Sequence, residues 1–373
     1  MTIEIREITS KRELKTFIDF PQALYKGNPF YVPSLYFDEI NQLDKDKNPA
    51  FASARARYWL AYRDGKIVGR IAGIHVPAHL QKWGENYMRF GWIDFIDDAE
   101  VVRSLIDTVE NWAKAEGLSG IHGPLGFTDL DREGMLVEGF DKVATLATLY
   151  NYPYYPKRME ELGFVKDVDW VENEIMIVDR SADKLEKTAQ IVEKRYGLHM
   201  FTGKKKDLLK LAPQIFDVLN EAYRHLYGTV PLTETQIKAY VDQYFGLAMT
   251  DYIPVVLDKD NRVVAFGISF PSFSKALQKS KGKLFPFGFI HFLVAMKKAD
   301  RADLYLEGVR DEYLGKGLNG MMMNTLYKNF VKNGIKTVES NPTLEMNNHV
   351  QVQWKYFDAK QHKRRRIYIK KFD

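Results

Sequence analysis

A glycine-rich turn in the last sixth of this 373-residue sequence has the residue types that most directly suggest chemistry. The segment GKGLNG, residues 315–320, places three glycines at the start of a stretch with helical periodicity. Glycines let backbone N–H groups approach an anion closely, the first turn of a helix offers unpaired N–H groups at the positive end of its dipole, and Lys316 adds charge. The turn is therefore a candidate phosphate-binding site. A loop that only leads into a helix is the alternative.

The glycine spacing is also that of the dinucleotide-binding fingerprint G-x-G-x-x-G, and Glu339 follows the last glycine by nineteen residues. Two observations argue against a dinucleotide-binding fold. In that fold the first glycine closes a strand directly, whereas here we expect the strand to end at Val309, six residues before Gly315. In addition, about 35 residues follow Glu339, which is too few for the further parallel strands that such a sheet needs.

Two predicted β-hairpins, about 195 residues apart, indicate that the chain contains a duplicated unit. The first covers residues 58–76 and turns at Asp64-Gly65, and the second covers residues 252–270. Helix-compatible segments precede each hairpin, at residues 11–44 and 212–248. A strand, a helix and a strand follow each: residues 88–96, 99–117 and 119–127 in the first half, and residues 302–309, 317–334 and 335–341 in the second.

This order of elements predicts an α/β fold of two tandem domains, each a mixed central sheet flanked by helices. The chain length agrees, because 373 residues are many for one domain. We expect the boundary between Ser181 and Tyr196, after a strand at residues 171–178, with domains at residues 1–185 and 186–373.

The segment LYLEGVRDEYLGKGLNGMMMNTLYKNFVKNG, residues 304–334, resembles the acetyl-CoA-binding signature of the GNAT superfamily of acyl-CoA N-acyltransferases. The surrounding elements match that family in order, so the resemblance covers residues 200–373. In that family the amides of the turn hold the coenzyme A pyrophosphate, and the acyl thioester lies along the preceding strand where it diverges from the next. The resemblance implies acetyl-CoA or another acyl-CoA as co-substrate, no metal, and the following coenzyme site: Val309, Arg310, Gly315, Lys316, Gly317, Leu318, Asn319, Gly320, Asn341 and Asn347.

The same resemblance implies catalytic groups for acyl transfer to an amine, which needs a base, a donor to the thioester carbonyl and optionally an acid for the thiolate. Glu307, on the strand before the turn, and Glu339, at the end of the next strand, are the candidate bases, and the amide of Val309 is the candidate donor. Solvated carboxylates without a role are the alternative. Trp354 stands where the family has a tyrosine that donates a proton to the leaving thiolate, and tryptophan does not fill that role. The proton would then come from Tyr356 or from water, or the site has no such acid.

Other departures from the family pattern concern both halves. Leu314 replaces the arginine or glutamine that opens the motif, and Asn319 replaces its closing glycine or alanine. In the first half the position of the turn is taken by IDDAE, residues 96–100, whose three acids would repel a pyrophosphate. The motif YNYPYYPKRMEELGF, residues 150–164, resembles the family's closing motif. We therefore interpret the first half as a degenerate repeat that supplies an interface and part of an acceptor wall.

Charge and hydropathy exclude several function classes. The chain has no cysteine, which excludes thiolate catalysis and cysteine-ligated metals. Zinc at His75 and His79 is disfavoured by the intervening Pro77, and the calcium-like DLDREG, residues 129–134, lacks the glutamate at its twelfth position. HKRRR, residues 362–366, is interpreted as part of a C-terminal strand with a solvated polar face, with nucleic-acid binding as the alternative.

The longest apolar run, residues 284–296, falls short of the ~20 residues of a membrane span. A buried helix is the favoured interpretation, with an interfacial helix or an apolar wall on the acceptor side as alternatives. The N-terminus lacks the hydrophobic region of a signal peptide, which together with the absence of cysteine favours a cytoplasmic protein.

The function predicted from the sequence is acyl transfer, with acetyl as the expected group, from acyl-CoA to an amine of a small molecule or peptide. The reaction would proceed directly in a ternary complex in the C-terminal half. A non-catalytic acyl-CoA-binding or interaction protein on the same fold is the rival hypothesis. Nucleic acid is disfavoured as a partner, no transmembrane segment is expected, and a homodimer is compatible with the sequence.

Overall fold

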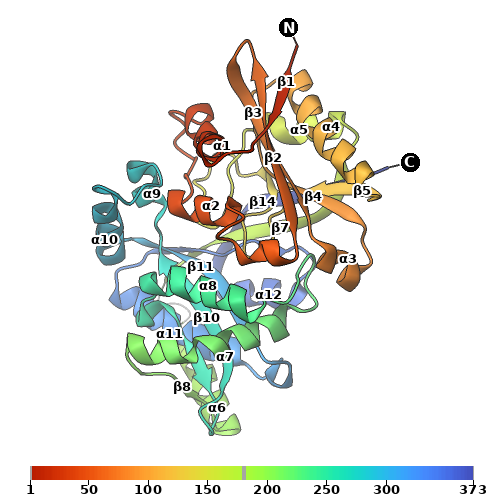
Figure 1. Cartoon of the computed structure of the whole chain (residues 1–373). Coiled ribbons are helices and arrows are strands. Elements are labelled where there is room, and N and C mark those ends of the chain that lie inside the picture. The colour runs from red at the N-terminus through yellow and green to blue at the C-terminus, as the bar shows by residue number, and fades with distance from the viewer. Residues whose placement is uncertain (1, 179–181, 373) are drawn as a thin grey trace.

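One mixed sheet of 14 strands runs through the molecule in the computed structural model, which describes residues 2–178 and 182–372 (Figure 1). The strands are β1 (Glu4–Glu7), β2 (Arg55–Arg63), β3 (Lys66–His75), β4 (Tyr87–Phe95), β5 (Gly120–Gly123), β6 (Met135–Glu138), β7 (Val165–Met176), β8 (His199–Met200), β9 (Val255–Leu257), β10 (Val263–Pro271), β11 (Arg301–Val309), β12 (Thr337–Glu339), β13 (Thr343–Leu344) and β14 (Asp358–Lys371).

Helices flank this sheet in both halves of the chain. They are α1 (Lys11–Leu24), α2 (Tyr36–Leu43), α3 (Pro77–Trp83), α4 (Ala99–Ala115), α5 (Tyr154–Glu161), α6 (Ala182–Tyr196), α7 (Lys205–Tyr223), α8 (Glu234–Tyr244), α9 (Ser274–Ser280), α10 (Gly288–Lys298), α11 (Leu318–Lys332) and α12 (Asn348–Gln353). Both predicted hairpins and both strand–helix–strand units are confirmed. The turn of the first hairpin holds Asp64 and Gly65 at φ of 51° and 74°, as a two-residue hairpin turn of the mirror-image type requires.

The two halves of the sheet are joined by an exchange of strands. The order is β1-β2-β3-β4-β5-β14-β7-β12-β11-β10-β9-β8, so β14 lies between β5 and β7, and β7 lies between β14 and β12. In Figure 1 the blue C-terminal strand crosses into the red-to-yellow half, and the chain ends beside β5. The segment in which we expect the domain boundary forms helix α6, which packs against α11. The sequence does not predict this exchange.

Each half contains one parallel pair of strands that diverges. β11 pairs with β12 only from Arg301 to Asp303, and β4 pairs with β5 only from Tyr87 to Arg89. In the first half the chain after β5 fills the gap, because Leu125 donates a backbone hydrogen bond of 2.8 Å to Phe90. A Cβ atom on Gly91 would lie 2.4 Å from the carbonyl oxygen of Leu125, so only glycine permits this approach.

The basic segment at residues 362–366 does lie in a strand, β14, and Arg364 and Arg366 on one face are partly exposed, but the expectation of a solvated polar face is wrong for two other residues of the segment. Lys363 and Arg365 are each 1% exposed. Lys363 contacts the buried carboxylates of Glu172, at 3.3 Å, and Glu339, and Arg365 pairs with Glu172 at 2.5 Å. Charges without water need paired partners, and acids on the neighbouring strands β7 and β12 supply them.

The expectation that residues 284–296 form a buried helix is also wrong. Helix α10 exists, but Phe292 is its only buried residue within the described chain. Phe285 and Phe287 in the preceding loop are 80% and 71% exposed. None of the described helices is long and apolar enough to cross a bilayer.

Candidate active site

The predicted anion site lies at the N-terminus of α11, where the structure shows an uncapped helix start. Its N-cap is Gly317 at a φ of 86°, and no side chain caps the helix. Lys316 lies over the rings of Tyr196 and Tyr313, with its Nζ about 5 Å from each centroid. The corresponding helix of the first half, α4, is capped by Asp98, whose carboxylate accepts from the backbone N–H groups of Glu100 and Val101. The first turn of α4 is therefore occupied by the chain's own anion.

The strand before the turn, β11, has a free edge on the side of β12. Beyond Asp303 its partner strand diverges, and no other strand of the described residues pairs with the second half of β11 on that side. β11 also has a β-bulge at Tyr305, which is skipped between the pairs Ile268–Leu306 and Ser269–Leu304. A bulge bends the strand and increases its local twist. Asn341, after β12, donates a hydrogen bond of 2.8 Å to the carbonyl oxygen of Tyr305 and so reaches across the opening.

Glu307 and the glycine turn are connected through one side chain. The amide of Gln353 donates to Glu307 at 3.1 Å and accepts from the amide of Asn319 at 3.4 Å. Burial raises the pKa of Glu307, and the hydrogen bond from Gln353 opposes that rise. A carboxyl group with a raised pKa, close to the coenzyme turn predicted from the sequence, is better suited to accept a proton than an ordinary glutamate.

The remaining predicted residues lie in differing surroundings. Arg310 pairs with Glu221 at 2.6 Å, and Asn347 caps α12. Glu339 is completely buried and contacts the cations of Arg301 and Lys363 and the imidazole of His362. The side chain of Tyr356 lies outside the described residues. The geometry thus favours Glu307 over Glu339 as the base, because Glu339 is held by its ion pairs.

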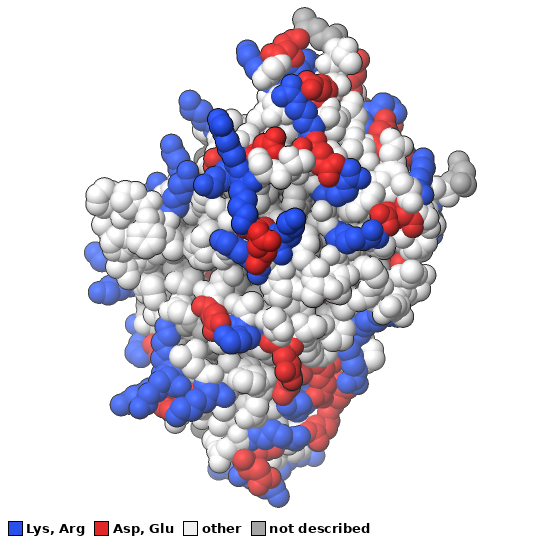
Figure 2. All heavy atoms as spheres, viewed as in Figure 1, with Lys and Arg blue, Asp and Glu red and all other residues white. Residues whose placement is uncertain are grey.

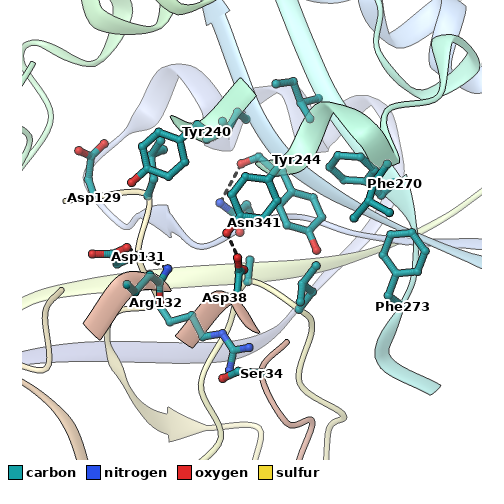
Figure 3. Close-up of a pocket in the computed structure, with 18 of the residues that line it drawn as sticks. Ser34, Asp38, Asp129, Asp131, Arg132, Tyr240, Tyr244, Phe270, Phe273 and Asn341 are labelled. Carbon is teal, nitrogen blue, oxygen red and sulfur yellow. Dashed lines mark hydrogen bonds between the residues drawn. The ribbon is translucent and has the colours of Figure 1, made fainter. Parts of the chain in front are cut away.

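A cavity of about 190 Å³ lies between the two halves of the chain, next to β11 (Figure 3). Its apolar wall comes mainly from the second half and includes Phe216, Ile268, Phe270, Phe273 and Leu306. Its polar groups come from both halves, and they include Ser34, Asp38, Glu39, Gln42, Asp129, Asp131, Arg132, Tyr240, Tyr244, Tyr305 and Asn341. Both halves of the chain therefore line this cavity.

Asp38 is the most distinctive polar group of the cavity. One carboxylate oxygen accepts a hydrogen bond of 2.5 Å from the hydroxyl of Tyr244 (Figure 3), and the other is buried without a partner among the described residues. Burial raises its pKa to about 7. The hydroxyl of Tyr305 is likewise buried and unpartnered among the described residues. A ligand with a positively charged donor would satisfy Asp38.

Sequence reasoning missed Asp38, Tyr244 and Tyr305. Asp38 lies in α2, about 270 residues from β11 in the chain, and one aspartate on a polar helix carries no signal of its own.

The histidine pair considered in the sequence does not form. His79 lies near Glu85 and His122 rather than in a pair with His75. Arg89 donates to Nδ1 of His79, so the proton lies on Nε2, where Glu85 accepts it.

Comparison with known proteins places the chain in a family. It is 30% identical to protein YghO of Escherichia coli strain K12 over 374 residues, which cover 98% of this chain and 95% of YghO. The chain belongs to the YghO family. It is also 25% identical to the bacterial ceramide synthase of Caulobacter vibrioides over 323 residues, or 83% of this chain and 81% of that protein. No protein-family model matches the sequence.

The fold of this YghO-family chain is the tandem GNAT fold, as the sequence predicts. A tandem GNAT protein from the clavulanic acid biosynthesis pathway superposes with a TM-score of 0.58, at 10% identity, over 99% of this chain and 98% of that one. At this identity the likeness establishes the fold alone. The chemistry of the YghO-family chain has to be argued from its own residues.

Proposed function

We propose that the chain transfers an acyl group from acyl-CoA to the primary amine of an amphiphilic acceptor. The observation that carries the proposal is the adjacency of two sites on β11. The first site consists of the uncapped N-terminal turn of α11 together with Glu307 of β11. The second site is the apolar cavity that Tyr305 and Leu306 of β11 line, and it contains the carboxylate oxygen of Asp38 that has no partner among the described residues.

The coenzyme would occupy the C-terminal half. The turn at residues 315–320 offers backbone N–H groups and Lys316 to a pyrophosphate, and the unpaired edge of β11 offers backbone donors and acceptors to the pantetheine chain. When bound, acyl-CoA supplies a thioester whose carbonyl carbon bonds to the amine nitrogen, while the carbon–sulfur bond breaks and coenzyme A leaves as the thiolate. The first half offers neither feature, since Asp98 caps α4 and Leu125 fills the strand opening.

The acceptor would be a long-chain amine. A carboxylate and an unpartnered tyrosine hydroxyl suit an ammonium or amino-alcohol head, and the phenylalanine and leucine wall suits the first carbons of its chain. The Caulobacter relative is named a ceramide synthase, and a ceramide is the amide of a long-chain amino alcohol. This name supports the same acceptor class here, and it favours an acyl group longer than the acetyl group expected from the sequence.

Three groups of the chain would carry the reaction. Asp38 orients the ammonium, and Glu307 removes its proton so that the nitrogen lone pair becomes nucleophilic. The amide N–H of Val309 donates to the developing oxyanion. Tyr356 or water gives a proton to the leaving sulfur and takes up the second proton, which the nitrogen loses as the amide forms.

Calorimetric titration with acetyl-CoA and with a long-chain acyl-CoA tests the coenzyme site. We expect binding to the wild-type protein and loss of binding in Gly315→Glu, which adds a carboxylate to the turn at a φ of 72°, where a Cβ atom would meet nothing within 4 Å. Gly334→Glu is the matched control, because Gly334 follows the other end of α11 at a similar φ of 73°. Binding by all three proteins would place the coenzyme elsewhere, and binding by none would refute acyl-CoA as a substrate.

The rival function, acyl-CoA binding without catalysis, is favoured by one observation. Trp354 stands in the position of the family's tyrosine, and its side chain is buried in a hydrophobic cluster. Incubation with long-chain amines separates the two. Amide product from the wild type but not from Glu307→Gln, with acyl-CoA binding retained in both, supports the enzyme. Binding without product on any such amine supports the rival.

A further inference from the structure

An exposed apolar surface surrounds α10. It consists of Phe285, Phe287, Phe289, Ile290, Leu293 and Val294, here called the α10 patch, and each of these side chains is more than 40% exposed. Positions 289, 290, 293 and 294 share one face of the helix, while Phe292 points inward and is 4% exposed. Six large apolar side chains on one short segment are more than scattered surface residues, and they indicate an interaction site.

The charge around the α10 patch has one sign. Residues 272–299 contain six lysines and no acidic residue, and all six lysines are exposed: Lys275, Lys279, Lys281, Lys283, Lys297 and Lys298. Lys275 lies 3.4 Å from Asp300, just beyond the segment. In Figure 2 the region of α9 and α10 is a white protrusion at the left edge of the molecule, with blue side chains above and below it.

We propose that the α10 patch docks the protein on an anionic phospholipid bilayer. With 11 residues, α10 is too short to span a membrane, but its apolar face can insert below the headgroups while the lysines contact lipid phosphates. A protein partner that binds stably here would need acidic side chains placed opposite the lysines, whereas an anionic bilayer offers negative charge over its whole surface. Exposed phenylalanines ringed by lysines match the two attractions of an anionic bilayer, burial of apolar area and surface potential.

The α10 patch is connected to the cavity. The ring of Phe292 packs on Phe273 with centroids 5.2 Å apart, and Phe273 lines the cavity wall. A long-chain amine resides mainly in a bilayer, so docking here would place the cavity near its supply of acceptor. This consequence rests on the proposed function, whereas docking itself does not.

Co-sedimentation with lipid vesicles tests the proposal. We expect the wild type to bind vesicles containing about one third phosphatidylglycerol, to bind pure phosphatidylcholine at least about ten-fold more weakly, and to be released by high salt. Phe285→Ser/Phe287→Ser should lower binding about thirty-fold or more, because two exposed rings no longer enter the bilayer. Lys297→Glu/Lys298→Glu should lower it at least about ten-fold. Val331→Ser, at a 51% exposed site on α11, should leave it unchanged.

Three results would overturn the proposal. One is no sedimentation of the wild type with anionic vesicles. Another is equal loss of binding in Val331→Ser and in the double phenylalanine variant. The third is a dimer of the wild type in analytical ultracentrifugation without lipid, together with a monomer for the double phenylalanine variant. The α10 patch would then bind a second copy of the chain. Acyl-CoA titration of the same variants distinguishes failure of docking from failure of the proposed function, because docking variants should keep coenzyme binding.

Discussion

Replacement of Asp38 by asparagine should stabilise the protein at alkaline pH and much less at acidic pH. The asparagine side chain keeps the size of the aspartate and an acceptor for the hydroxyl of Tyr244, but it carries no charge. Burial raises the pKa of Asp38 from 3.8 to about 7, so the folded state favours the protonated carboxyl. A carboxyl group whose pKa is raised by folding contributes stability at low pH, and this contribution is lost as pH rises toward the folded-state value.

The magnitude follows from the two pKa values. A shift of about three units at 1.36 kcal/mol per unit is about 4 kcal/mol in total. At pH 5 the wild type has already lost roughly 1.6 kcal/mol of this contribution to its free energy of unfolding, and by pH 8 it has lost nearly all of it. The difference in free energy of unfolding between Asp38→Asn and the wild type should therefore grow by about 2–3 kcal/mol between pH 5 and pH 8. Other titrating groups are common to both proteins and cancel in the difference.

Urea unfolding of both proteins at several pH values between 5 and 8 measures this growth. Asp98→Asn is the control, because the hydrogen bond from Arg63 lowers the pKa of Asp98 and its titration lies below this range. Its effect on stability should be flat from pH 5 to pH 8. A flat difference for Asp38→Asn would refute the reasoning, since the Asp38 carboxyl would then be solvated. An added long-chain amine should stabilise the wild type more at pH 8 than at pH 5, and should lose this trend in the variant.

Three further predictions concern the catalytic centre and the sheet. Glu307→Gln should lower kcat about 100-fold or more, and the wild-type rate should rise with pH through a pKa above the usual glutamate range, which a pH–rate profile would reveal or contradict. Lys363→Met should cost about 3–5 kcal/mol of unfolding free energy, because it leaves two buried carboxylates short of a cation; an unchanged urea midpoint would show that water reaches them. A chain truncated before Asp358 should lose cooperative unfolding in both halves, and protection from hydrogen exchange in either half would contradict this.

Local patterns in the sequence were sufficient for the order of elements. Asp64-Gly65 predicts the first hairpin because two residues at positive φ match the twist of paired strands. The strand ending at Val309 and the glycines after it predict the uncapped start of α11. These features depend on neighbours within a few residues, which the sequence displays directly.

The features that the sequence did not predict depend on distant partners. Asp38 becomes a pocket residue only when α2 lies opposite β11 and Tyr244. The lysine and arginine of β14 are buried because acids of β7 and β12 lie beside them, and alternation along one strand does not reveal its neighbours. The apolar run of α10 favours a core helix from its composition, but hydropathy does not show what lies against a helix, and here most of the run is exposed.

The exchange of β7 and β14 has a consequence for how this gene can change. Duplicated genes often lose the copy that has no function of its own, and here the half without the uncapped helix would be that copy. Its strand β7, however, forms the neighbour of β12, and the strand that completes its own sheet comes from the last residues of the chain. Deleting either half would expose a long unpaired strand edge and leave buried ions without partners. The half whose helix α4 is capped by Asp98 is therefore part of the scaffold of the other half, so a change in its surface or cavity wall costs less than its loss.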